Sequence, residues 1–166
     1  MRTSVWFLIL LFVLAVDINA QAAKTPKFTA YPAMVEKARV KAINFKRNPG
    51  SRTYRTRLSE AVSSGVNFAG HYILTGWGCG TGCTNAAIID ARTGDVIWPE
   101  EFINIDATYG DGYSEKQLDF KKNSRLLIIH GVPGSADENP KPRPPGDYYY
   151  EWRQDRFRLL KVVKKT

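Results

Sequence analysis

The stretch NFAGHYILTGWGCGTGCTNAAIIDA, residues 67–91, carries the clearest structural signal in the chain. It predicts a strand over residues 67–77 and a second strand over residues 84–91, joined by a loop of alternating glycines and cysteines. Ala87, Ile88 and Ile89 are apolar on both faces of the second strand, which is typical of a strand in the middle of a sheet. The prediction is therefore a β-hairpin that lies in the core, with a glycine-rich loop at its end. We call residues 78–83 the glycine loop.

The glycine loop holds the only two cysteines of the chain, Cys79 and Cys83. The three intervening residues include two glycines, so the backbone can bend until the two side chains meet. Two close cysteines in an oxidising compartment usually pair, and we expect a disulfide here. Two alternatives remain: a zinc site completed by His71 and His130, or a thiolate nucleophile with one of these histidines as its base.

The N-terminus predicts export. Arg2 precedes an apolar run over residues 5–16, and small residues follow at Ala20 and Ala22. This order is that of a secretory signal peptide over residues 1–20 with cleavage near residues 20–22. The run is shorter than the roughly 20 residues that span a bilayer, so a retained membrane anchor is the weaker alternative. We expect a periplasmic or secreted protein without a transmembrane segment after processing.

The rest of the chain predicts a single domain with an α+β fold. Its 166 residues, 43% of them hydrophobic, are enough for one core. Ser51 can cap a helix that runs to about residue 64 and ends at Gly65. Residues 32–42 show a weaker helical period, which competes with strand-like alternation over residues 39–45. Further strands are expected at residues 96–98, 117–120, 125–130, 148–153 and 157–163.

These elements predict one antiparallel, meander-like sheet of about seven short strands behind one or two N-terminal helices. We expect residues 21–50 to form a basic N-terminal segment, extended and weakly attached over residues 21–31. Residues 51–166 then form the α+β domain.

A wider pattern supports export and fold. The segments NFAGHY (67–72), WGCGTGC (77–83) and AIID (87–90), with SRLLI (124–128) and YEW (150–152) further on, resemble a pattern found in uncharacterised secreted bacterial proteins. The resemblance covers about residues 54–163. That family has no established activity, so it implies nothing about chemistry.

Charge is unevenly distributed along the chain, which carries a net charge of +8. Eight basic residues and no acid lie between residues 37 and 57, Arg52 and Arg55 among them, and six basic residues with one acid lie between residues 153 and 165. Such surfaces either keep a protein soluble or attract an anionic partner. Export and the lack of a recognition motif argue against nucleic acid.

The candidate site is a binding surface. It comprises Gly78, Gly80, Thr81 and Gly82 of the glycine loop, the adjacent Trp77, His71 on the strand leading to the loop, and the cations Arg52 and Arg55. No catalytic motif, metal ligand set or cofactor site is predicted. The favoured function is an exported envelope binding protein, such as an inhibitor or immunity protein, that binds another envelope protein or an anionic glycan. The alternatives are a structural envelope protein held to anionic surfaces by charge and a small cysteine-dependent hydrolase or amidase.

Overall fold

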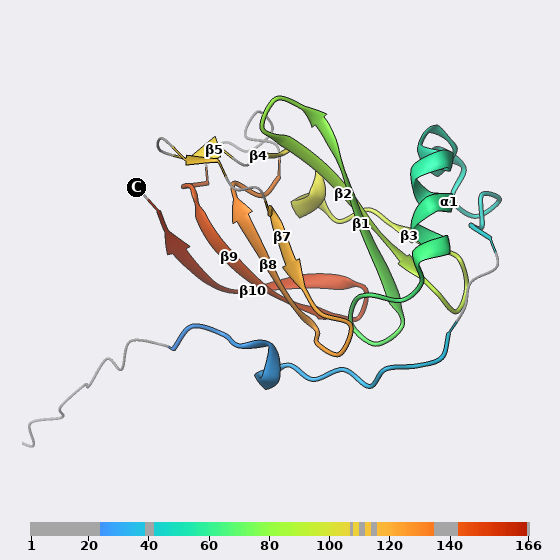
Figure 1. The fold of residues 1–166 in the computed structure, drawn as a ribbon, viewed down its shortest axis with the longest axis horizontal. Helices are drawn as coiled ribbons and strands as arrows, with labels where there is room; N and C mark the ends of the chain where they lie inside the picture. Colours follow the sequence, from blue (N-terminus) through green and yellow to red (C-terminus); the bar gives the residue numbers. More distant parts are fainter. Residues whose placement is uncertain are drawn as a thin grey trace, which may run out of the picture.

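In the part of the chain that the structure describes, two antiparallel sheets and one α-helix form the fold, stacked as shown in Figure 1. The structure is a computed structural model, and it describes residues 24–38, 42–106, 108–109, 112–113, 116–134 and 143–165. The predicted signal peptide lies outside the described residues. Within the described residues, four strands pair in each sheet and two further short strands pair with each other.

The first sheet is built on the predicted hairpin. Strand β1 (Tyr72–Gly80) pairs with β2 (Cys83–Asp90), in register from Tyr72 opposite Asp90 to Gly78 opposite Thr84. The short strands β3 (Val96–Ile97) and β4 (Ile105–Asp106) also pair with β2, and the 3-10 helix η3 (Glu100–Phe102) lies between them in sequence. Strand β2 therefore holds the sheet together, as its apolar sequence predicts.

The second sheet is a meander in the order β10-β9-β8-β7. Its strands are β7 (Leu118–Phe120), β8 (Leu126–Gly131), β9 (Gly146–Arg153) and β10 (Arg156–Lys164). Strands β5 (Thr108–Tyr109) and β6 (Gly112–Tyr113) form a separate pair. The expectation of one sheet of about seven strands is thus wrong: the strands divide between two sheets that pack face to face.

One α-helix covers the first sheet. Helix α1 (Arg55–Ser64) follows the 3-10 helix η2 (Pro49–Tyr54), and Gly65 ends it with a φ of 78°, as predicted. Ser51 does not cap the helix. It is buried within η2, where its hydroxyl accepts a hydrogen bond from the Trp98 indole N–H at 3.1 Å.

The hairpin separates two hydrophobic cores. Leu74 and Ile88 face the second sheet, where they pack with Leu127, Ile129 and the aromatic side chains of β9. Ile73 and Ile89 point the other way, toward Leu58 and Ala61 of α1. Neighbouring residues of one strand enter opposite cores because their side chains alternate. The resulting layers are helix, first sheet and second sheet.

The N-terminal strap, which we define as residues 28–38, ties these layers at one end. It begins with the 3-10 helix η1 (Phe28–Ala30), whose Phe28 packs with Tyr31 against the second sheet. The buried Ser124 hydroxyl donates to the carbonyls of Phe28 and Tyr31. The prediction that residues 21–31 are weakly attached to the domain is therefore wrong for residues 28–31.

The helix predicted over residues 32–42 is also wrong for residues 32–38, which form no helix. Backbone groups elsewhere in the fold bind this segment instead. The Ala33 N–H donates to the Asn123 carbonyl, and the Glu36 N–H donates to the Gly70 carbonyl at 3.0 Å. Residues 39–41 lie outside the described residues.

Gly70 provides a test of this attachment. Its φ is 88°, and a Cβ placed there would lie 2.2 Å from the Met34 carbonyl oxygen. Gly70→Ala should lower the free energy of unfolding by about 3 kcal/mol, because it adds a backbone clash to an unfavourable φ. Gly50→Ala is the matched control, since no atom lies within 4 Å of its Cβ position. Urea unfolding followed by tryptophan fluorescence measures both; equal stability of the two variants would contradict the close approach.

Candidate functional site

The glycine loop forms the exposed end of the β1–β2 hairpin. Cys79 and Cys83 form the predicted disulfide, with Cα atoms 5.2 Å apart. The strand register shifts between Gly78 and Gly80, and Gly80 and Gly82 adopt positive φ values of 148° and 68°. These two values require glycine, and the side chain of Thr81 between them is exposed. The loop is therefore held by a disulfide on one side and by strand pairing at its base.

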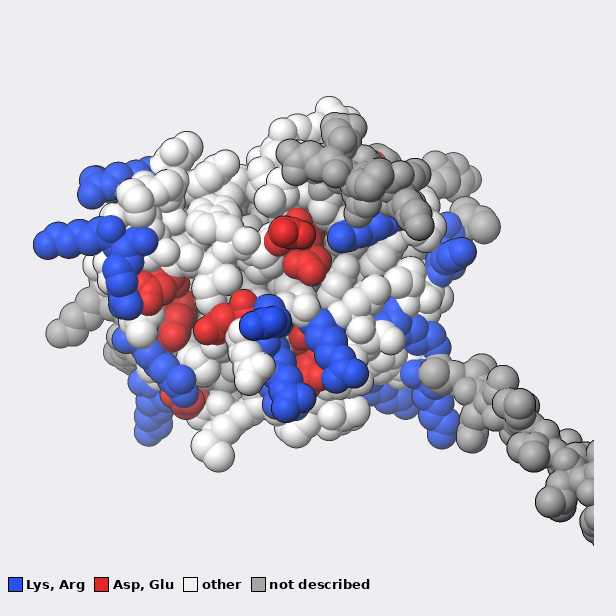
Figure 2. Space-filling model, turned by 180° about the vertical axis from the view of Figure 1, so that it is seen from behind, with Lys and Arg blue, Asp and Glu red and all other residues white. Residues whose placement is uncertain are grey.

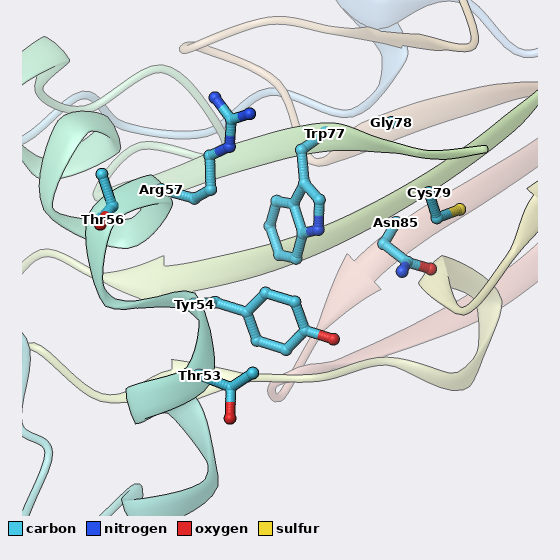
Figure 3. A pocket seen from close by; sticks show the side chains of 8 residues that line it. All are labelled: Thr53, Tyr54, Thr56, Arg57, Trp77, Gly78, Cys79 and Asn85. Carbon is cyan, nitrogen blue, oxygen red and sulfur yellow. The ribbon is translucent and has the colours of Figure 1, made fainter.

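An open pocket of about 360 Å³ lies beside the glycine loop, between the hairpin and the helical segment (Figure 3). We call it the aromatic pocket. Thr53 and Tyr54 come from η2, Thr56 and Arg57 from α1, and the remaining residues from the hairpin: Trp77, Gly78, Cys79 and Asn85. The pocket thus adjoins the glycine loop through the disulfide itself.

Aromatic rings make the inner wall of the pocket. The rings of Tyr54 and Trp77 are 4.9 Å apart, and Tyr54 also contacts Trp98 at 5.2 Å. Trp98 stays 38% exposed although its indole N–H is bound by Ser51. Partly exposed Trp and Tyr side chains held by neighbours are favourable contact residues, because little conformational entropy is lost when a partner covers them.

The polar groups of the pocket can bind a partner. The Asn85 side-chain oxygen accepts the Asn104 backbone N–H at 2.8 Å, whereas its amide N–H groups form no hydrogen bond with a described residue. Arg57 is exposed, and its contact with Glu60 is long, at 3.8 Å. No carboxylate lines the pocket. The site is therefore suited to a ligand with acceptor atoms and negative charge.

The predicted cations Arg52 and Arg55 are next in sequence to residues that line this pocket, but they are not among its lining residues. Arg52 is exposed on η2, and Arg55 begins α1, where its guanidinium lies 5.2 Å from the centre of the Phe45 ring. Figure 2 shows basic side chains projecting at the end of the molecule where these elements lie, at the left of that view. The structure thus places Trp77 and Gly78 at the pocket, and Arg52 and Arg55 on the helical segment that supplies its other wall.

His71 does not belong to that region. It immediately precedes β1, whereas the glycine loop lies at the opposite end of this nine-residue strand, about 26 Å away at the usual rise per residue. The hydroxyl of the adjacent Tyr72 donates to Asp155 in the β9–β10 turn at 2.6 Å, which places this turn at the same end. The hypothesis of His71 as a contact residue next to the glycine loop therefore lacks geometric support.

His71 belongs to a charged cluster under the N-terminal strap. Its Nδ1 lies 3.7 Å from Glu36 and its Nε2 lies 4.0 Å from Asp90, while Arg92 binds Glu36 through two hydrogen bonds. Burial and then the positive charge of Arg92 lower the pKa of His71, against opposing effects of Asp90 and Glu36. These effects together favour the neutral imidazole, whose buried Nε2 has no hydrogen-bond partner.

His130 has a separate structural role. Its Nδ1 lies 2.7 Å from Asp147, which also binds Lys165 at 2.6 Å. Burial raises the pKa of Asp147, but the hydrogen bonds from Lys165 and His130 outweigh burial and the net shift is downward. These contacts of Asp147 join β8, β9 and Lys165.

The alternatives that require free cysteines find no support in this geometry. Both cysteines are in the disulfide, and no histidine lines the aromatic pocket beside it. Within the described ranges, no group of three or more His, Cys, Asp and Glu side chains is placed to hold a metal ion.

Sequence reasoning misses Tyr54, Arg57 and Asn85 as site residues. The helical pattern places Tyr54 on a buried face, and Asn85 carries no motif. The two residues lie 31 positions apart in sequence, so only the packing of η2 against the hairpin brings them together.

Comparison with known proteins does not assign the chain to a family. No protein-family model, curated protein or solved structure matches the chain. Among the described helices, none has the length and apolar character needed to span a bilayer.

The environment of His71 predicts a pH dependence. Its pKa is lowered on folding, so below about pH 6.5 the unfolded chain binds more protons than the folded chain. The free energy of unfolding should therefore fall between about pH 7.5 and pH 5.5, and His71→Gln should reduce that fall. Urea unfolding at the two pH values measures it. An identical fall in both proteins would rule out the neutral, buried imidazole.

Proposed function

We propose that this chain is an exported, non-catalytic binding protein that engages an acidic partner protein of the cell envelope through the glycine loop and the aromatic pocket. The observation that carries the proposal is the junction of these two features at the disulfide. A narrow, disulfide-closed loop projects from a buried hairpin, and a pocket with two aromatic rings opens beside it. Loops held by a rigid scaffold are frequent binding elements.

Rigidity favours a binding role for the loop. The base of the hairpin is buried on both faces, because Ile88 and Ile89 are both 0% exposed. A loop that is already fixed by strand pairing and by a disulfide loses little conformational entropy on binding. Such a loop can enter a cleft on another protein, which is how an inhibitor or immunity protein blocks an enzyme.

The basic residues near the pocket indicate that the partner is negatively charged. Arg57 lines the pocket, the exposed Arg52 and Arg55 belong to the same helical segment, and no acid lines the pocket. Exposed cations at the rim of an interface accelerate association with an acidic surface more than they slow dissociation. A wall-degrading enzyme with a basic surface is therefore excluded as the partner in this proposal, and one with an acidic active-site cleft fits it.

Two other functions remain as outcomes of the test. A structural envelope protein held only by charge would need the basic surfaces but not the glycine loop. A glycan-binding protein would use Tyr54 and Trp77 as stacking surfaces, with the Asn85 amide as a donor. Export, which all of these functions share, rests on the signal-like N-terminus and fits the disulfide.

Photo-crosslinking distinguishes these functions while the partner is still unidentified. A photoreactive amino acid replaces Thr81 in the exported full-length chain, and the matched control carries it at Gln154 in the exposed β9–β10 turn. We expect a discrete protein adduct from position 81 and none from position 154. Adducts of equal yield at both positions, an adduct with glycan only, or no adduct from position 81 would contradict the proposal.

Substitutions at the same positions test the energetics. Thr81→Arg should weaken retention on the envelope fraction by about tenfold or more, because the added bulk blocks close approach of the loop. Gln154→Arg adds the same charge at the other end of β1 and should bind as the parent chain does. Arg52→Glu with Arg55→Glu should slow association and flatten its salt dependence. If the Thr81→Arg variant were retained as well as the parent chain, the glycine loop would not be the binding site, and the basic surface would be the candidate instead.

A further inference from the structure

A second cavity lies against the second sheet, next to η3. Its volume is about 490 Å³, which is within the usual range of small-molecule sites. We call it the sheet cavity. Side chains of β9 and β10 make its floor, and its edges come from η3 and from the residues before β9; the lining includes Glu101, Arg143, Tyr150, Leu159, Val162 and Lys164. It shares no lining residue with the aromatic pocket.

An irregularity in β10 makes the floor apolar. Leu159 pairs with Tyr150, but the register then shifts, so that Val162 rather than Lys161 lies opposite Tyr148. The shift places Leu159 and Val162 on the same face of the sheet as the core residue Phe157. Leu159 nevertheless remains 50% exposed. The face presents apolar surface that no described residue covers.

The Tyr150 hydroxyl also lacks a partner at this site. Tyr150 is only 3% exposed, yet its hydroxyl forms no hydrogen bond with a described residue. The neighbouring Tyr148 differs, because its hydroxyl donates to the Pro144 carbonyl. Arg143 and Glu101 line the same cavity as Tyr150 and are charged groups of its wall. The hydroxyl oxygen is not among the buried side-chain atoms that lack a partner, so solvent reaches it from the cavity, and a ligand atom can replace that water.

The charges at the cavity favour an anion. Arg143 donates from one N–H to the Pro133 carbonyl at 2.8 Å, which leaves further donors of its guanidinium for a ligand. Lys164 is exposed at the rim and forms no ion pair with a described residue. Glu101 is the one carboxyl group in the lining, and burial raises its pKa. Two cations therefore face a single acid.

We propose that the sheet cavity binds a small carboxylic acid with a straight apolar chain. The carboxylate accepts hydrogen bonds from the Arg143 guanidinium and the Tyr150 hydroxyl, and the chain covers Leu159 and Val162. This combination explains three features together: the uncovered apolar floor, the unpartnered hydroxyl and the excess of positive charge. The site is independent of the proposed partner surface, so either proposal can fail without the other.

Calorimetric titration of the mature protein with decanoate below its micelle concentration tests the ligand class. We expect one molecule bound per chain. Decanol lacks the charge and acetate lacks the chain, so each should bind at least tenfold more weakly. No binding of decanoate up to millimolar concentration, or equal binding of decanol, would overturn the proposal.

Three variants locate the site. Arg143→Gln and Tyr150→Phe should each weaken decanoate binding by about tenfold, the usual effect of removing a hydrogen bond to a charged group. Arg158→Gln is the control for lost charge, because Arg158 is exposed and lies opposite Glu151 on the other face of the sheet. It should bind as the parent chain does.

Stability separates binding from folding in these variants. Tyr150→Phe removes a hydroxyl that has no partner among the described residues, so its urea unfolding midpoint should equal or exceed that of the parent chain. A folded Tyr150→Phe or Arg143→Gln variant that binds decanoate with parental affinity would exclude this cavity as the site.

Discussion

The structure depends on burial of strand β2 on both of its faces. Ile88 packs toward the second sheet and Ile89 toward α1, and neither side chain is exposed. Because these neighbours belong to different cores, helix α1 packs on one face of the hairpin and the second sheet packs on the other. Truncating either isoleucine to alanine removes packing worth about 2–5 kcal/mol, a large fraction of the stability of a domain of this size. The pairing of β1 with β2 is therefore the constraint that positions every other layer.

That constraint also determines where the two proposed binding surfaces lie. The buried part of the hairpin ends before the glycine loop, whose exposed residues are fixed at their base but contribute little to either core. The aromatic pocket lies on the face of the hairpin that packs against the helical segment, and the sheet cavity lies on the side of the second sheet. A stable centre with exposed edges allows two sites to form on one small domain without sharing side chains.

Local sequence predicts the elements here better than it predicts their assembly. The hairpin, the disulfide and the end of α1 at Gly65 follow from short-range patterns: apolar runs, glycine spacing and cysteine spacing. The division into two sheets does not, because strand order depends on packing between distant segments. Residues 32–38 have a helical pattern, but backbone partners at Gly70 and Asn123 hold them extended. The register shift in β10 gives Val162 rather than Lys161 to the cavity face, and no sequence signal marks it.

We propose that the hairpin supplies stability, whereas the disulfide supplies a rigid loop for binding. The Cys79→Ser, Cys83→Ser double variant tests it directly when its unfolding free energy and its crosslinking from position 81 are both measured. Opening so short a loop should cost about 2 kcal/mol of stability and leave the fold intact. The crosslinking yield should fall severalfold, since the loop then samples many conformations. A folded double variant that crosslinks as efficiently as the parent chain would contradict the account.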